Sequence, residues 1–249
     1  MDLPGYIRRS GYMQGMFILL VLVLGIMGWG WLMRVTVDRI DVHGATNAEP
    51  DEIVELAGVD TGNVMFQVSP RLVVDRVSRH PWVAGANVTR LPTGVLTITV
   101  RERIPVLQVL LSDGRPGHYL DADGYQMPPS HSSAYDVPLL SGFEEDFHPV
   151  AKIDDAGLRE FVEALEVNRK RAGILISEVI VTQDEFWLRL EPSQMQGSTP
   201  VRLGHDDFEN KLGRLADFWD QRIARHPDRT FELIDLRFSS QVIAREKGR

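Results

Sequence analysis

The side chains best suited to metal binding or proton transfer are scattered along this chain. None of its seven histidines has another four residues away, so the H-x-x-x-H and H-E-x-x-H patterns of zinc sites are missing. The chain has no cysteine, which excludes disulfides, thiolate metal sites and cysteine nucleophiles. It also has no Walker loop, nucleophile elbow or G-x-G-x-x-G pattern. The sequence therefore predicts no catalytic residue, no metal and no cofactor.

Two groups of acidic residues come nearest to a chemical site. Residues 121–124 (DADG) resemble the start of a calcium loop, but the twelfth position would be Ser132 instead of Glu, and the glycine is misplaced. A plain turn is the better interpretation. Residues 144–146 (EED) could suggest the paired carboxylates of a glycosidase, yet adjacent acids in a polar stretch are typical of a solvated surface.

The composition is that of a folded protein with an acidic surface. The 249 residues are 43 % apolar and 25 % charged, which is ordinary for globular domains and allows one or two of them. Residues 1–34 carry three basic side chains and one acidic one, so the remainder carries 24 basic against 34 acidic residues. Nucleic-acid binding needs basic residues to neutralise phosphates. We therefore expect no nucleic-acid partner. Because the motifs of catalytic sites are also missing, we expect no small-molecule substrate.

The elements that would carry any site begin with a membrane anchor. Residues 16–33 contain no charged side chain and are long enough as a helix to span a hydrocarbon core. Arg8 and Arg9 precede this run, and positive charge favours leaving the N-terminus in the cytoplasm. A cleaved signal peptide is the alternative, but its apolar core would be shorter and followed by small residues. The long run with Trp29 and Trp31 at its far end favours an uncleaved anchor.

A small α+β unit is expected after the anchor. Residues 35–42 alternate as a strand, and Asn47 can cap a helix that ends at Gly58. Ser69 followed by proline opens a second helix. Residues 83–89 and 94–100 form a predicted hairpin. The order strand, helix, helix, strand, strand leaves an edge strand that can add another chain.

A second unit is expected from residue 104 onward. We predict an antiparallel sheet covered by two long helices over residues 154–172 and 206–225. The strands fall near residues 106–111, 119–120, 125–127, 174–182, 186–190, 200–203, 231–238 and 241–244. The two units together give an α+β fold class.

Several phrases of the sequence resemble those of one family. IDVHGATNAEPDEIVELAG, HPWVAGANVTRLPTGVLTITVRERIPV, YLDADGYQMP, VPLLSG, VRLGHDDFENKLGRL and IDLRFSS occur in the same order as in the FtsQ/DivIB bacterial cell-division proteins. The resemblance implies a cytoplasmic tail (1–15), a transmembrane helix (16–33), a POTRA domain (35–103), a β domain (104–245) and a C-terminal tail (246–249). The tail is short for the family. Phe238 stands where a tyrosine is frequent, and serines 239–240 replace a turn that often contains glycine.

The resemblance also implies a role and a site. Members of the family are division scaffolds in the inner membrane at the septum, with the C-terminal region in the periplasm. They bind FtsB and FtsL and link early cytoplasmic division proteins to septal peptidoglycan synthesis. FtsB would add as a strand to the last strands, with Arg237 meeting a partner carboxylate and Phe238 as an anchor. The implied partner-binding residues are Arg237, Phe238, Ser239, Ser240, Gln241, Val242 and Ile243, and the implied recruitment residues of the POTRA domain are Val83 and Val88.

Three other interpretations remain open. Another POTRA-bearing envelope assembly factor usually carries several such units before a barrel, whereas this sequence offers one. A membrane-anchored periplasmic hydrolase would need a cleft with convergent acids or a metal. A structural module with an unrelated partner would share the fold without the division role. Phe238 could equally pack in the chain's own core.

Overall fold

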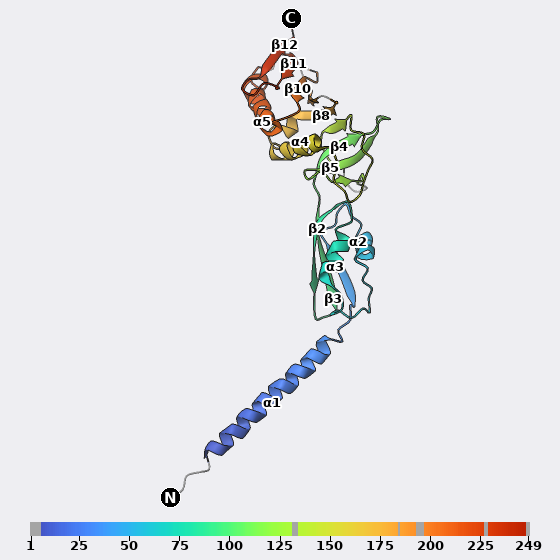
Figure 1. Cartoon of the computed structure of the whole chain (residues 1–249), viewed down its shortest axis with the longest axis vertical. Helices are drawn as coiled ribbons and strands as arrows, with labels where there is room; N and C mark the ends of the chain where they lie inside the picture. The colour runs from blue at the N-terminus through green and yellow to red at the C-terminus, as the bar shows by residue number, and fades with distance from the viewer. Residues whose placement is uncertain (1–5, 131–133, 184, 193–196, 227–228, 248–249) are drawn as a thin grey trace. The chain divides into compact units, whose positions relative to one another are not determined.

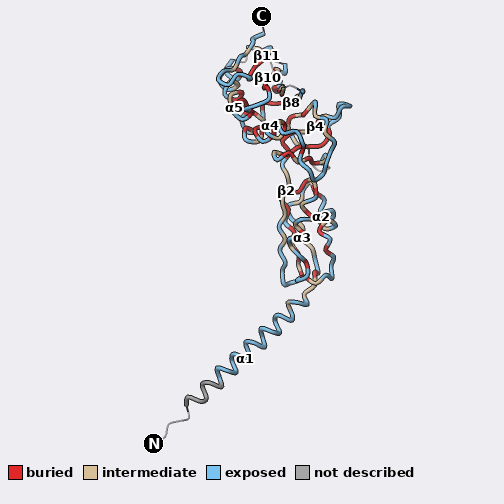
Figure 2. The backbone as a smooth tube through the Cα atoms, in the orientation of Figure 1, coloured by how far each residue is buried: buried red, intermediate tan, exposed pale blue. Residues whose placement is uncertain are grey.

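The computed structural model describes residues 6–130, 134–183, 185–192, 197–226 and 229–247 (Figure 1). It begins with helix α1, Tyr6–Leu32. The stretch Met13–Leu32 is long and apolar enough to cross a membrane, and none of it is buried. Figure 2 colours the described residues of α1 as exposed almost throughout, unlike the folded part, where buried residues are frequent. The helix starts ahead of the apolar run at residue 16, so it includes part of the predicted tail.

The folded part divides into two compact units. The first holds the residues up to Ser78 together with Gly85–Arg101, and the second holds Arg79–Ala84 with the residues from Glu102 onward. The three-stranded sheet has the order β1-β3-β2, with β1 parallel to β3. Its elements are β1 (Arg39–His43), α2 (Pro50–Ala57), α3 (Pro70–Val77), β2 (Val83–Arg90) and β3 (Val95–Glu102). This succession confirms the predicted strand-helix-helix-strand-strand order.

Local sequence signals explain the boundaries of the two short helices. The Ser69 hydroxyl accepts a hydrogen bond from the Leu72 amide, and Pro70 occupies the first helical position of α3, as predicted. Helix α2 ends at Gly58, which adopts a left-handed conformation with φ of 60°. The cap of α2 is Glu49, not the predicted Asn47, because Pro50 fixes the first helical position. Both helices bury one face, through Ile53, Ala57, Val73 and Val77.

The second unit is built on a nine-stranded sheet with the order β12-β11-β10-β9-β8-β7-β4-β5-β6. The sheet is mixed, because β4–β7, β7–β8 and β10–β11 are parallel pairs, whereas the sequence predicted an antiparallel sheet. The strands are β4 (Pro105–Leu110), β5 (Pro116–Asp121), β6 (Gln126–Met127), β7 (Leu139–Ser141), β8 (Ile176–Val181), β9 (Phe186–Leu190), β10 (Pro200–Gly204), β11 (Phe231–Asp235) and β12 (Ile243–Glu246). Helices occupy the connections that join parallel neighbours β7–β8 and β10–β11.

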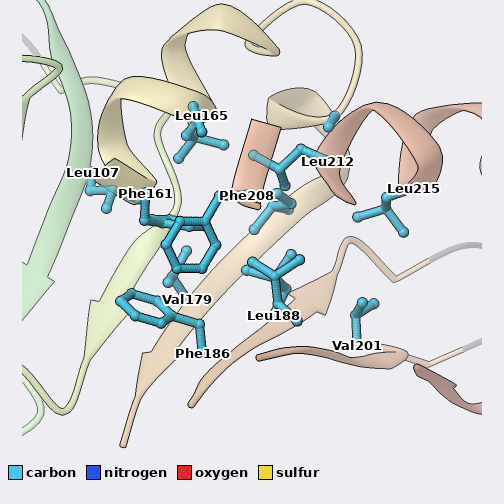
Figure 3. Packing of buried hydrophobic residues seen from close by; sticks show 14 of the residues in the cluster. Leu107, Phe161, Leu165, Val179, Phe186, Leu188, Val201, Phe208, Leu212 and Leu215 are labelled. Atoms are coloured by element: carbon cyan, nitrogen blue, oxygen red, sulfur yellow. The ribbon is translucent and has the colours of Figure 1, made fainter. Parts of the chain in front are cut away.

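The two helices of this unit cover its sheet. They are α4 (Ala156–Val167) and α5 (Phe208–Phe218), which continues as a π-helical turn, Trp219–Ile223. Figure 3 shows Phe161 of α4 and Phe208 of α5 meeting Phe186 of the sheet, with ring centroids 4.9–5.5 Å apart. Edge-to-face and offset contacts of this kind stabilise aromatic clusters beyond the area that they bury. This apolar layer sets the position of α5. Helix α5 also faces the connection between β11 and β12.

Helix α4 is shorter than the predicted helix 154–172. The Asn168 side chain donates to the carbonyl of Ala164, which satisfies an acceptor at the end of α4. The amides of Ala172 and Gly173 both donate to the Asn168 carbonyl, so the chain turns there instead of extending the helix. A short 3-10 helix, Gly173–Leu175, then leads into β8.

Candidate partner-binding edge

Strand β12 lies at one end of the nine-stranded sheet. It pairs antiparallel with β11, from Asp235 opposite Ile243 to Phe231 opposite Glu246, with one irregularity. Within the described residues, no strand pairs with its other side. Such an edge presents unpaired N–H and C=O groups to any extended chain that approaches. The predicted tail of residues 246–249 begins inside β12, because Glu246 is still paired with Phe231.

A seven-residue connection, 236–242, joins β11 to β12, and its start is fixed by Asp235. The carboxylate of Asp235 accepts hydrogen bonds from the Arg237 amide at 3.1 Å and from Nη2 of Arg237 at 2.8 Å. The hydrogen-bonded Arg237 side chain lowers the pKa of Asp235, and the same pairing raises the pKa of Arg237. This local turn ends β11 three residues before the predicted limit of 238.

A second ion pair lies beside the first on the neighbouring strands. Arg202 of β10 donates to Glu185, with its Nη2 at 2.7 Å from the carboxylate. The Glu185 carboxylate also accepts from the indole Nε1 of Trp187. The Arg202 side chain lowers the pKa of Glu185, and the charge of Arg237 contributes to that shift. Each carboxylate neutralises its own arginine, so both Arg202 and Arg237 have a partner within the chain.

Apolar side chains are divided between the core and the surface in this segment. Leu236 is fully buried, and Val242 and Ala244 pack partly against the core. Phe238 and Ile243 instead point outward, with 43 % and 46 % of their surface exposed. The core packing considered for Phe238 is therefore not what the structure shows. An exposed aromatic and a β-branched side chain beside an unpaired edge are typical of a protein-binding surface.

The predicted partner-binding residues thus gather on one turn and the first residue of an edge strand. Arg237, Phe238, Ser239, Ser240 and Gln241 are exposed, Val242 is half-buried, and Ile243 opens β12. The arrangement offers backbone hydrogen bonds and apolar contact to an extended chain. Arg237 pairs with Asp235 through its Nε and Nη2 atoms and keeps 38 % of its side chain exposed, and its contact with a partner carboxylate stays a prediction.

The two predicted recruitment residues have different surroundings. Both lie on β2, which forms an edge of the three-stranded sheet. Val83 is only 1 % exposed, so its side chain contributes to packing. Val88 is half-buried and offers some surface. The recruitment role of these two positions stays a prediction.

The acidic groups considered for catalysis have structural partners. The carboxylate of Asp121 accepts from the amides of Asp123 and Tyr125 and pairs with Arg103 at 2.8 Å, as expected of a turn. The Glu145 carboxylate accepts from the amides of residues 154 and 155, just before α4. Among the described residues, no group of three or more histidines and acids is placed to hold a metal ion.

One residue of this surface was missed by the sequence analysis. Arg214 of α5 donates through Nη1 to the carbonyl of Phe238 at 2.5 Å and to that of Gln241 at 3.4 Å. It lies 24 residues before Phe238 in the chain. A helical arginine in an otherwise regular pattern gives no sign in the sequence that it contacts a distant turn. The packing of α5 against the sheet creates this contact.

Comparison with known proteins identifies relatives of the whole chain. Residues 35–103 match the family model for the FtsQ-type POTRA domain, and residues 104–245 match the model for the C-terminal region related to FtsQ/DivIB. The cell division protein FtsQ of Rhodothermus marinus is 45 % identical over 97 % of this chain and 90 % of its own length. FtsQ of Salinibacter ruber is 40 % identical over 94 % of the chain and 92 % of its length. FtsQ of a Geobacter strain is 31 % identical over 90 % and 82 %.

Proposed function

The chain belongs to the FtsQ/DivIB family of cell-division proteins, and we propose that it acts as a non-catalytic scaffold of the division machinery. In this role it binds FtsB and FtsL outside the cytoplasm and links early division proteins to the enzymes of septal wall synthesis. The proposal rests on family membership over both folded regions. Family membership also argues against an envelope assembly factor with a barrel.

The observation that carries the binding role is the edge of strand β12. Its outer side has no strand partner within the described residues, and Phe238 and Ile243 are exposed beside it. An extended segment of FtsB would add to β12 by backbone pairing and would cover both apolar side chains. Because Arg237 is held by Asp235, we assign Arg237 to shaping the turn, and we place the binding energy on Phe238, Ile243 and the backbone.

The helix α1 supports the membrane half of the proposal. Its apolar stretch Met13–Leu32 would anchor the chain in the inner membrane, with the folded units on the periplasmic side at the septum. Arg8 and Arg9 before the stretch favour this orientation. We further propose that the POTRA domain spans 35–103 and the β domain 104–245, and that the exposed part of Val88 on β2 contributes to recruitment.

Co-purification of the full chain with its partners tests this function. The membrane protein, solubilised in detergent, would be mixed with FtsB and FtsL of the same organism and isolated through a tag. We expect both partners to be retained by the wild-type chain. Retention should fall when Ile243 is replaced by aspartate, because a charge on the apolar contact must then lose its hydration. Retention of neither partner by the wild-type chain would refute the scaffold role.

A matched variant separates loss of the surface from loss of the fold. Ile174 is also an exposed aliphatic residue of the second unit, 68 % accessible, but it lies before β8, away from β12 in the strand order. Ile174→Asp should leave retention unchanged. Equal losses in both variants would mean that the β12 edge is not the binding surface.

A further inference from the structure

We propose that Arg214 is a positioning residue of the partner-binding edge, which holds the β11–β12 turn in the shape that presents Phe238. This inference rests on the proposed function for its effect on binding. Its structural half, the claim that Arg214 orders the turn in the free chain, does not depend on that function. None of the predicted site residues lies on α5, so the proposal adds a helix to the determinants of this surface.

The contacts of Arg214 span the turn. One guanidinium nitrogen, Nη1, reaches the carbonyls of both Phe238 and Gln241, which flank the two-residue tip at 239–240. One nitrogen that donates to both carbonyls ties the two arms of the turn to a single point on α5. The base of the turn is fixed separately, because the Leu236 amide donates to the carbonyl of Arg202 and the Arg237 side chain pairs with Asp235.

Helix α5 is a suitable support for such a contact. Leu212 and Leu215, on either side of Arg214, are fully buried in the core, and Figure 3 shows both on the face of α5 that packs over the sheet. Phe208 at the start of the helix is also fully buried in the aromatic cluster. The core therefore sets the position of the Arg214 backbone. Two hydrogen bonds from the Arg214 side chain then hold the turn against α5.

An anion-binding role for Arg214 fits the structure less well. The hollow beside it is lined by Asp207, Glu209 and Asp217, together with Ser239 of the turn. Asp217 is neutralised by Arg171 at 2.6 Å, but the other two acids leave the hollow unfavourable for a carboxylate or phosphate. The guanidinium therefore serves the turn, whose carbonyls are the acceptors that it does contact.

The effect on binding follows from preorganisation. If the turn is ordered before the partner arrives, association does not have to order it. Without the Arg214 contacts, the turn would have to become ordered when the partner binds. FtsB binding should then be about tenfold weaker, which corresponds to the loss of one hydrogen bond to a charged group. Fewer contacts in the free turn should also let its amides exchange faster with solvent.

The test uses the full chain in nanodiscs with two substitutions and a control. Arg214→Met keeps an unbranched side chain and removes the donors, whereas Arg214→Lys keeps the charge and one donor nitrogen on a more flexible stem. Arg171→Met removes an exposed arginine that pairs with α5 but does not contact the turn. Hydrogen exchange at residues 238–242 and affinity for the extracytoplasmic segment of FtsB are measured for each.

We expect faster exchange in the turn and about tenfold weaker binding for Arg214→Met, a smaller effect for Arg214→Lys, and wild-type behaviour for Arg171→Met. Wild-type affinity in Arg214→Met would overturn the positioning role. If the wild-type chain binds no FtsB, the proposed function fails, and the inference is then decided by exchange alone. Unchanged exchange at residues 238–242 would overturn it, and faster exchange confined to the turn would support its structural half.

Discussion

Replacing Phe238 by alanine should weaken partner binding by an amount that its exposed area sets. The side chain is 43 % exposed in the free chain. An aromatic residue buries roughly 200 Å² in full, so about 90 Å² remains for a partner to cover. At about 25 cal/mol per Å², that area corresponds to about 2 kcal/mol, or roughly a 30-fold loss of affinity. The remaining area of roughly 110 Å² is already buried in the free chain, so by the same coefficient the substitution should also lower the free energy of unfolding by up to about 3 kcal/mol.

Isothermal titration of the full chain in nanodiscs with the FtsB segment measures this loss, and thermal unfolding of the same samples measures the fold. Phe238→Tyr is the matched variant, because it keeps the ring and adds a hydroxyl that can remain in water. It should bind like the wild-type chain. If Phe238→Ala binds with unchanged affinity, the assignment of Phe238 as an anchor is refuted even where the scaffold role stands.

Three further predictions concern stability, each measured by denaturant or thermal unfolding. Phe208→Ala removes a fully buried ring from the aromatic cluster and should cost about 3–5 kcal/mol; a loss below about 1 kcal/mol would contradict the packing. Gly142, at a φ of +80°, lies close to a carbonyl of β8, and Gly142→Ala would press its new Cβ against that carbonyl. It should therefore destabilise the chain more than Gly114→Ala, because Gly114 has a similar φ but open space around it. Equal effects would mean that the close approach is unimportant. Arg237→Met should destabilise the chain at neutral pH, where Asp235 with its lowered pKa is ionised in the fold, and the difference from wild type should shrink as the pH falls below about 4; a pH-independent difference would exclude the ion pair as its cause.

The first folded unit could be predicted almost entirely from local signals. Ser69 followed by Pro70 marks the start of α3, and Gly58 marks the end of α2. The mixed character of the second sheet was missed because no strand was predicted over residues 139–141, so the strand-helix-strand unit β7-α4-β8, which favours parallel pairing, was not recognised. The parallel pairing of β7 with β4 depends on long-range contacts.

The candidate site was predicted through a resemblance, and its local structure could not be predicted from the sequence. The strands around segment 237–243 were predicted to end at residue 238 and to resume at 241. The structure shows a longer connection, because β11 ends at Asp235 and β12 begins at Ile243. Asp235 is the local reason, since its carboxylate accepts the Arg237 amide and ends the ladder. The same carboxylate forms an ion pair with Arg237, the arginine that was expected to meet a partner carboxylate. The role of Arg214 depends on a contact across 24 residues, which no local pattern reports.

The central claim is that this membrane-anchored chain is a division scaffold, and depletion in the cell tests it most directly. The native gene would be placed under a repressible promoter, and cell length and septum formation would be followed by microscopy as the protein disappears. We expect long filaments without septa, rescued by the wild-type chain and poorly by Phe238→Ala. Cells that continue to divide at normal length after the protein is gone would contradict the account.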